Sequence, residues 1–158
     1  MHQVNTRGTF LCTQACLPHL QRSANPHVLM LSPPLNLAPR WFAPHVAYTI
    51  AKYGMSLCVL GMAEEFRGAG VAVNALWPRT GIDTAAIAYI AGPAMQRRCR
   101  KPAIVADAAH AILTRAARAC TGNFFIDDDV LREEGVTDFA PYRHEGVAES
   151  ELMRDFFV

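Results

Sequence analysis

Tyr48 and Lys52 lie four residues apart in a segment that reads as a helix, so their side chains are neighbours on one helix face. A free phenol has a pKa near 10, and a nearby ammonium group lowers that pKa towards neutrality because it favours the phenolate. A tyrosine tuned in this way can give or take a proton as a general acid–base catalyst. The chain has only two lysines and four tyrosines, so chance supplies roughly 0.05 such pairs. The alternative is a solvated lysine beside a half-buried tyrosine.

Two further polar residues sit where chemistry is expected. Ser32 directly follows an apolar run over residues 27–31 that is typical of a buried strand, and open α/β sheets bind ligands at the carboxyl ends of their strands. The Ser32 hydroxyl could therefore donate to a substrate oxygen while Tyr48 transfers the proton. Asn5 interrupts an otherwise apolar helix; the alternative for it is an amide satisfied by its neighbours or by water.

The elements that must position these residues alternate along the chain. Helical periodicity predicts helices over residues 2–22, 45–67 and 102–118 and a short helix from residue 84, and apolar runs predict strands over residues 27–31, 71–76 and 122–127. Crossovers of this length require parallel pairing, which predicts part of an α/β layered sheet. Residues 78–84 form a loop after the second strand, and the chain from about residue 132 is charged and irregular.

Composition excludes several classes of protein. Of the 158 residues, 51% are hydrophobic and 18% charged, and the formal net charge is +1. This balance argues against a nucleic-acid-binding surface and against a disordered acidic chain. No apolar run reaches the 18 or so residues of a membrane span, and residues 1–20 lack the pattern of a signal peptide. The scarcity of charge predicts surface that is covered by a partner or by missing chain.

The five cysteines predict no metal site. They stand at positions 12, 16, 58, 99 and 120, without the paired ligand spacing of zinc modules. An odd number of cysteines without a secretory signal fits a reduced, soluble intracellular protein.

In this order the motifs resemble the short-chain dehydrogenase/reductase family. The matching elements are Val4-Asn5-Thr6-Arg7-Gly8, a strand that ends at Ser32, Tyr48-x-x-x-Lys52 and Val73-Asn74-Ala75-Leu76-Trp77-Pro78. The similarity continues through residues 32–37, 47–56, 61–66 and 121–127 and so covers nearly the whole chain. The resemblance implies an oxidoreductase that uses NAD or NADP on a carbonyl or secondary alcohol of a lipid or steroid-like substrate. It implies a peroxisomal or mitochondrial location.

The resemblance also implies roles for particular residues. Tyr48 would be the general acid/base, Lys52 would lower the pKa of Tyr48 and hold the nicotinamide ribose, and Ser32 would orient the substrate oxygen. Asn5 would support a water-mediated proton path. The loop after Pro78 would flank the nicotinamide; because Arg79 stands where the family usually has glycine, either Thr80 or Thr84 would contact the cofactor.

The glycine-rich turn that binds the cofactor pyrophosphate has no counterpart in these 158 residues. The chain is therefore expected to be the C-terminal half of a Rossmann-type doubly wound parallel sheet, with residues 1–131 as a partial dehydrogenase domain and residues 132–158 as its irregular tail. On this interpretation the isolated chain lacks half of the cofactor site and is inactive. The alternative function is that of an inactive truncated product that dimerises through the helices over residues 2–22 and 45–67, which commonly build such interfaces in the family.

Overall fold

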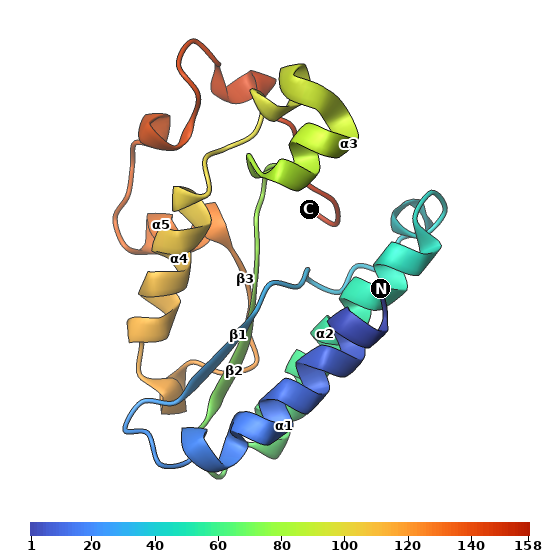
Figure 1. The fold of residues 1–158 in the computed structure, drawn as a ribbon. Helices are drawn as coiled ribbons and strands as arrows, with labels where there is room; N and C mark the ends of the chain where they lie inside the picture. Colours follow the sequence, from blue (N-terminus) through green and yellow to red (C-terminus); the bar gives the residue numbers. More distant parts are fainter. The chain divides into compact units, whose positions relative to one another are not determined.

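The computed structural model describes all of residues 1–158 (Figure 1). The chain forms two compact units. The first comprises Met1–Trp77, Leu113–Phe125 and Phe157, and the second comprises Pro78–Ile112, Ile126–Phe156 and Val158. The predicted boundary between residues 131 and 132 stays a prediction. The two units are groups of contacting residues, and each combines segments from distant parts of the chain. Each unit has its own packing.

A three-stranded parallel sheet, all of it except Ile126, forms the centre of the first unit. The strands β1 (His27–Met30), β2 (Ala72–Trp77) and β3 (Phe124–Ile126) lie in the order β1-β2-β3. In β1 and β2 the register runs from His27 opposite Ala72 to Met30 opposite Ala75. All six residues of β2 are buried, since a central strand that is covered on both faces has no solvent side.

The helices of the first unit follow the predicted pattern with two local differences. The predicted helix over residues 2–22 begins as a π-helical turn, η1 (Gln3–Arg7), continues as α1 (Gly8–Leu20) and contains Pro18 near its end. The predicted helix over residues 45–67 is α2 (Val46–Glu65). The proline-rich loop before α2 contains one 3₁₀ turn, η2 (Pro39–Trp41).

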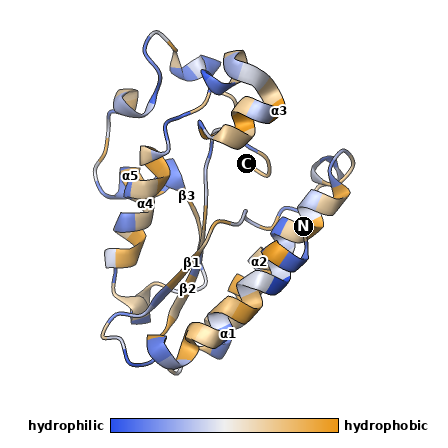
Figure 2. Ribbon diagram, in the orientation of Figure 1, coloured by the Kyte–Doolittle hydropathy of each residue, from blue (hydrophilic) through white to orange (hydrophobic).

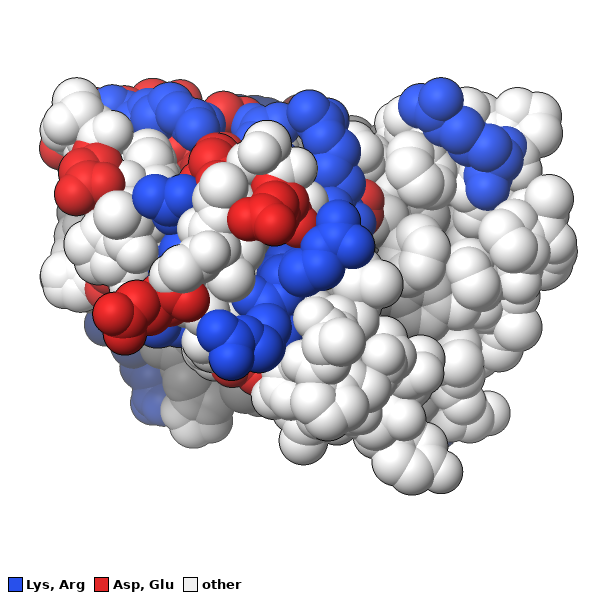
Figure 3. All heavy atoms as spheres, turned by 90° about the horizontal axis from the view of Figure 1, so that it is seen from above, with Lys and Arg blue, Asp and Glu red and all other residues white.

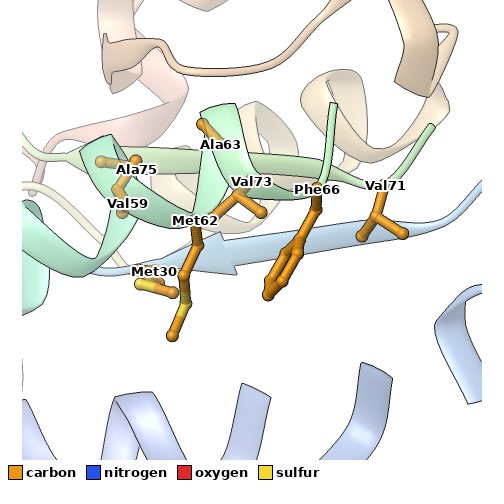
Figure 4. Close-up of a cluster of buried hydrophobic side chains, with 8 residues drawn as sticks. All are labelled: Met30, Val59, Met62, Ala63, Phe66, Val71, Val73 and Ala75. Carbon is orange, nitrogen blue, oxygen red and sulfur yellow. The ribbon is translucent and has the colours of Figure 1, made fainter. Parts of the chain in front are cut away.

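The core of this unit lies where α2 meets the strands. Val59, Met62 and Phe66 from α2 pack with Met30 of β1 and Val73 of β2, and all five side chains are buried (Figure 4). Leu17 and Leu20 of α1 pack against the same cluster. Burying each such side chain stabilises the fold by about 1.5–3 kcal/mol, so this cluster fixes α2 on the sheet.

The second unit is built from helices and turns. It contains α3 (Ala85–Gln96), most of α4 (Ala103–Thr114), α5 (Asp127–Glu133), η4 (Ala140–Tyr142) and η5 (Glu149–Glu151), whereas η3 (Ala117–Ala119) belongs to the first unit. The predicted helix over residues 102–118 ends at Thr114, and the predicted third strand ends at Ile126, one residue early. At Asp127 the chain turns into α5 because the Asp127 carboxylate accepts the backbone N–H of Asp128 and of Arg79.

Charge is distributed unevenly between the elements. The second unit contains most of the charged residues. Figure 3 shows basic and acidic side chains next to one another on the face in view. By length and composition α2 meets the criteria for a helix that crosses a membrane, as core helices of globular proteins also do.

Candidate active site

Lys52 and Ser32 lie close together in the first unit, although they belong to different elements. The Lys52 Nζ donates a hydrogen bond of 3.2 Å to the carbonyl oxygen of Leu31, and the ammonium lies 5.3 Å from the ring centroid of Trp77. Ser32 follows Leu31 and is fully buried. The Ser32 Oγ has no hydrogen-bond partner within the protein. An unpartnered buried hydroxyl costs about 1–3 kcal/mol, so this oxygen is available to a bound group at the end of β1.

Tyr48 lies one helical turn before Lys52 on α2 and is half-buried. Its ring stacks on that of Phe157, with the centroids 6.4 Å apart and the planes 14° from parallel. The helix therefore holds both members of the predicted pair in one regular element, as their spacing predicts. Their chemical roles stay predictions.

Three hydroxyl groups that the motif search missed hold the proline-rich loop against α2. They come from Thr49, Tyr53 and Ser56, which are all buried and share one face of the helix. Each donates to a loop carbonyl: Thr49 Oγ1 to Trp41 (2.5 Å), Tyr53 Oη to Asn36 (2.5 Å) and Ser56 Oγ to Pro33 (2.7 Å). A loop rich in proline has few N–H donors but many carbonyls. Hydroxyls at helical spacing in an apolar helix were the signal that could have found this contact.

Tyr53 differs from Tyr48 in its role. Burial raises the pKa of Tyr53, and this effect outweighs the hydrogen bond with the backbone of Asn36, which lowers it. Tyr53 therefore keeps its proton and acts as a donor to the loop. Of the two tyrosines on α2, Tyr48 remains the candidate for proton transfer.

Asn5 lies in the π-helical turn η1, where its Nδ2 donates to the carbonyl oxygen of Met1 at 3.1 Å. The next residue, Thr6, donates from Oγ1 to the carbonyl oxygen of Ala51 at 3.1 Å, one residue before Lys52. This close approach requires Gly54, since a Cβ there would lie 2.2 Å from the Thr6 Oγ1. Single π-helical turns occur often at functional sites, and this one packs η1 onto the part of α2 that contains Lys52.

Pro78, Thr80 and Thr84 belong to the second unit. Thr80 is buried and its Oγ1 has no hydrogen-bond partner within the protein. Thr84 is exposed and caps α3, because its side chain accepts the N–H of Ile87 at 3.4 Å. Of the two threonines, Thr80 therefore has the hydroxyl that is available to a ligand.

Arg79, which the resemblance left without a role, fastens this loop to α5. Its backbone N–H donates to Asp127 Oδ1 at 2.9 Å, its Nε to Asp128 Oδ1 at 2.7 Å, and its Nη2 lies 2.5 Å from Asp129 Oδ2. Burial alone would lower the pKa of Arg79, but the hydrogen bonds and charges of Asp128 and Asp129 raise it. Burial raises the pKa of Asp127, against the two N–H groups that it accepts. The loop after Pro78 is thus held by a side chain that a glycine could not supply.

Asn74, at the middle of β2, has a structural role. It is fully buried; its Nδ2 donates to the carbonyl oxygen of Cys120 at 2.7 Å and its Oδ1 accepts the N–H of Asn123 at 3.0 Å. Both bonds fasten the turn that leads into β3. The amide is therefore fully occupied within the sheet.

The chain is similar to proteins of known families over almost its entire length. Residues 1–129 match a family model described as enoyl-(acyl carrier protein) reductase. Hydroxysteroid dehydrogenase-like protein 2 of Danio rerio is 56% identical over 98% of this chain and 36% of its own length, and the rat protein of the same name, from Rattus norvegicus, is 56% identical over 100% and 29%. The chain thus spans about a third of the length of these curated relatives.

Solved structures show the same similarity in three dimensions. A putative dehydrogenase from Xanthomonas campestris superimposes with a TM-score of 0.91 at 52% identity, over 99% of this chain and 57% of that one. The strands, helices and strand-end residues described above therefore match a little over half of that dehydrogenase.

Proposed function

The chain belongs to the short-chain dehydrogenase/reductase family, and we propose that its candidate active site interconverts a carbonyl and a secondary alcohol with a nicotinamide cofactor, NAD or NADP. The predicted resemblance and the predicted α/β fold, half of a Rossmann-type domain, are both confirmed. An oxidoreductase kind of activity follows from the family. The direction and the substrate are parts of the proposal.

Four residues of the first unit have separate roles in the proposed proton transfer. The Ser32 hydroxyl donates to the substrate oxygen and fixes its position. The Tyr48 phenol gives its proton to that oxygen as the carbonyl becomes an alcohol, and takes it back in the reverse direction. The Lys52 ammonium, one turn away on α2, favours the phenolate that forms. Asn5 in η1 supports a water-mediated path by which the proton is replaced. A bound nicotinamide cofactor supplies or accepts the hydride.

The observation that carries the proposal is the unpartnered hydroxyl of Ser32. A serine needed only for packing would hydrogen-bond to the protein or be replaced by alanine, because a buried polar atom without a partner destabilises the fold. The Ser32 Oγ is buried and unpartnered, and Lys52 binds the carbonyl of the preceding residue. A substrate oxygen would complete the hydrogen bonding of this hydroxyl.

Several residues suit the cofactor. The buried, unpartnered Oγ1 of Thr80 would donate to a polar group of the nicotinamide, whereas the Thr84 hydroxyl is already used in a helix cap. We therefore propose Thr80 as the cofactor-binding threonine and Pro78 as the residue that turns the chain into this loop. Tyr48 and Lys52 would bind the ribose hydroxyls.

An apolar substrate of lipid or steroid-like character fits the surroundings of Tyr48. Its ring contacts Phe157, and Phe157 in turn contacts Trp41, Tyr53 and Trp77. Aromatic rings provide large apolar contact area. The curated relatives have hydroxysteroid dehydrogenase-like names, which supports the same class of substrate.

The test is turnover by the natural protein. Oxidation of NADH and NADPH is measured with a panel of aliphatic and steroid ketones, for the wild type and for Tyr48→Phe. The phenylalanine variant should fold and bind cofactor as the wild type does, and it should lose about 10²–10⁴-fold in kcat. Ketone reduction at the wild-type rate in Tyr48→Phe would refute the proposed role, as would a wild type that reduces no ketone and oxidises no alcohol.

A second candidate function, self-association, is favoured by the outer faces of the first unit's helices. Apolar side chains are exposed along η1, α1 and α2: Val4, Phe10, Leu11, Val46, Ile50, Leu57 and Leu60. Figure 2 shows hydrophobic stretches along the ribbons of α1 and α2. An apolar cavity of about 680 Å³ lies beside them, lined by Phe10 of α1, by Ile50 and Leu57 of α2, and by Phe42. Contiguous apolar surface of this kind marks interaction sites. We propose that a second copy of the chain covers it.

The test of self-association is the molar mass in solution, measured by light scattering. The wild type should be a dimer or larger. Leu57→Glu, at an exposed position on this surface, should be monomeric, and Leu113→Glu, at an exposed position on α4, should keep the mass of the wild type. A monomeric wild type would contradict this proposal and leave the enzymatic one unaffected.

A further inference from the structure

Phe157 is the one residue beyond residue 125 that belongs to the first unit. Its side chain is buried, with 3% exposed, whereas the adjacent Phe156 is 45% exposed. Its φ is +73°, in the left-handed region that bulky side chains rarely adopt. Such a conformation is unfavourable and persists only where the surroundings enforce it. Packing of the Phe157 ring is therefore strong enough to impose an unfavourable backbone.

The surroundings of the Phe157 ring are aromatic and include the candidate active site. The ring stacks on Tyr48 and contacts Trp41, Tyr53 and Trp77, with centroid distances between 5.1 and 6.4 Å. Trp77 is the same indole over which the Lys52 ammonium lies. The Phe157 ring thus contacts one member of the candidate pair directly, and it contacts the ring that faces the other.

We propose that Phe157 is a specificity-determining residue, a wall that limits the bulk of the carbonyl substrate beside Tyr48. This inference rests on the proposed function. If the Tyr48 hydroxyl hydrogen-bonds the reacting oxygen of the substrate, the carbon skeleton attached to that oxygen lies beside the aromatic ring of Tyr48. The phenyl ring of Phe157 fills the volume against that ring. Ketones with a narrow group on this side of the carbonyl are turned over more efficiently than ketones with a second fused ring there. A steroid-like substrate would therefore bind with its fused rings directed away from Phe157.

Two cyclic ketones of the same chemistry and different bulk test the inference. Cyclohexanone is the narrow substrate, and 2-decalone, which adds a fused ring, is the bulky one. In the natural protein, Phe157→Ala should raise the ratio of kcat/KM for 2-decalone to that for cyclohexanone by about tenfold or more, the scale on which apolar pockets discriminate size. Phe157→Leu should raise it less, in the same direction. Phe156→Ala, the matched control, should leave the ratio unchanged.

A binding measurement separates this inference from the proposed activity. Trp41 and Trp77 are the only tryptophans in the chain, and both contact Phe157, so their fluorescence reports on this wall. Titration with 2-decalone should give a Kd that is about tenfold lower for Phe157→Ala than for the wild type and for Phe156→Ala. If no protein reduces either ketone, the proposed activity fails and this Kd alone decides the inference.

The outcomes that overturn the inference are equally definite. An unchanged substrate ratio together with an unchanged Kd in Phe157→Ala would show that the ring does not border the substrate. If Phe157→Ala gives no cooperative thermal unfolding, Phe157→Leu decides in its place, by the same ratio and the same Kd. A rise in the ratio for Phe156→Ala equal to that for Phe157→Ala would assign the effect to general loosening of this segment and would likewise overturn it.

Discussion

The Lys52 ammonium and the Leu31 carbonyl oxygen form a hydrogen bond of 3.2 Å that joins α2 to the residue after β1. Tyr48 and Lys52 belong to the helix, and Ser32 belongs to the end of the strand. The bond brings the ammonium within one residue of the Ser32 hydroxyl. It is the contact by which two distant parts of the sequence become one candidate active site.

Removing the hydroxyl group from each of two buried serines, Ser32 and Ser56, should change the stability of the fold in different ways. Ser32→Ala removes an oxygen that has no partner in the protein, so the free energy of unfolding should stay within about 0.5 kcal/mol of the wild type or increase. Ser56→Ala leaves the Pro33 carbonyl without its donor and should destabilise by about 1–3 kcal/mol. Turnover should fall by about 10²-fold in Ser32→Ala. Urea unfolding and kcat measure the two effects; a Ser32→Ala variant that is less stable and fully active would reverse the assignment.

Two glycines of α2 should differ sharply when each is replaced by alanine. A Cβ at Gly54 would lie 2.2 Å from Thr6 Oγ1, whereas a Cβ at Gly61 meets nothing within 4 Å. Gly54→Ala should therefore destabilise by about 1–3 kcal/mol through overpacking, and Gly61→Ala should stabilise by about 0.5–1 kcal/mol through helix propensity. Chemical denaturation measures both. Combining Gly54→Ala with Thr6→Ala should recover part of the loss, and no recovery would argue against the contact.

The neighbouring aspartates Asp128 and Asp129 of α5 should contribute unequally to the stability of the second unit. Asp128 is buried and lies within ion-pair distance of Arg79, Arg100 and Arg132. Arg100 is itself buried, and its other carboxylate partner, Glu149, is half-exposed. Because Asp128→Asn removes a buried negative charge next to Arg100, it should cost about 3–5 kcal/mol.

Asp129 is the matched control for this change. It pairs with Arg79 and Arg132, but its carboxylate is half-exposed, so Asp129→Asn should cost at most about 1 kcal/mol. The free energies of unfolding of the two variants are compared at neutral pH. Equal losses would mean that exposure does not decide the strength of these pairs.

The Tyr142 phenol should lose its proton at an unusually high pH. Burial, together with its hydrogen bond of 2.7 Å to the Asp107 carboxylate, raises its pKa to about 12. Because this folded-state pKa lies above the unfolded value near 10, its contribution to stability is present below pH 10 or so and is lost as the pH rises to about 12.

The Tyr142 titration is followed by the ultraviolet absorbance of the phenolate. The difference between the wild type and Tyr142→Phe gives the part of the absorbance change that belongs to Tyr142. Asp107→Asn removes the negative charge and should bring the pKa of Tyr142 down towards that of a free phenol. If Asp107→Asn leaves the titration where it is, burial alone sets this pKa.

The sequence by itself determined the α/β fold class and the family, because these depend on local patterns. Apolar runs predicted all three strands, and helical periodicity predicted α1, α2 and α4 with small errors at their ends. The spacing of Tyr48 and Lys52 fixed them on one face of α2, since a helix turn is set by the backbone alone. The motifs also named the candidate residues, and their roles await the experiments above.

Only the tertiary structure decided how distant residues meet. The donation from Lys52 to Leu31, the three hydroxyls of α2 that hold the proline-rich loop, and the fastening of Arg79 to α5 all join segments that are far apart in the chain. The end of β3 at Ile126 was missed because the Asp127 carboxylate accepts an N–H from Arg79, 48 residues away. Phe157 stacks on Tyr48 for the same reason: packing between remote residues, which no local pattern encodes, sets its place.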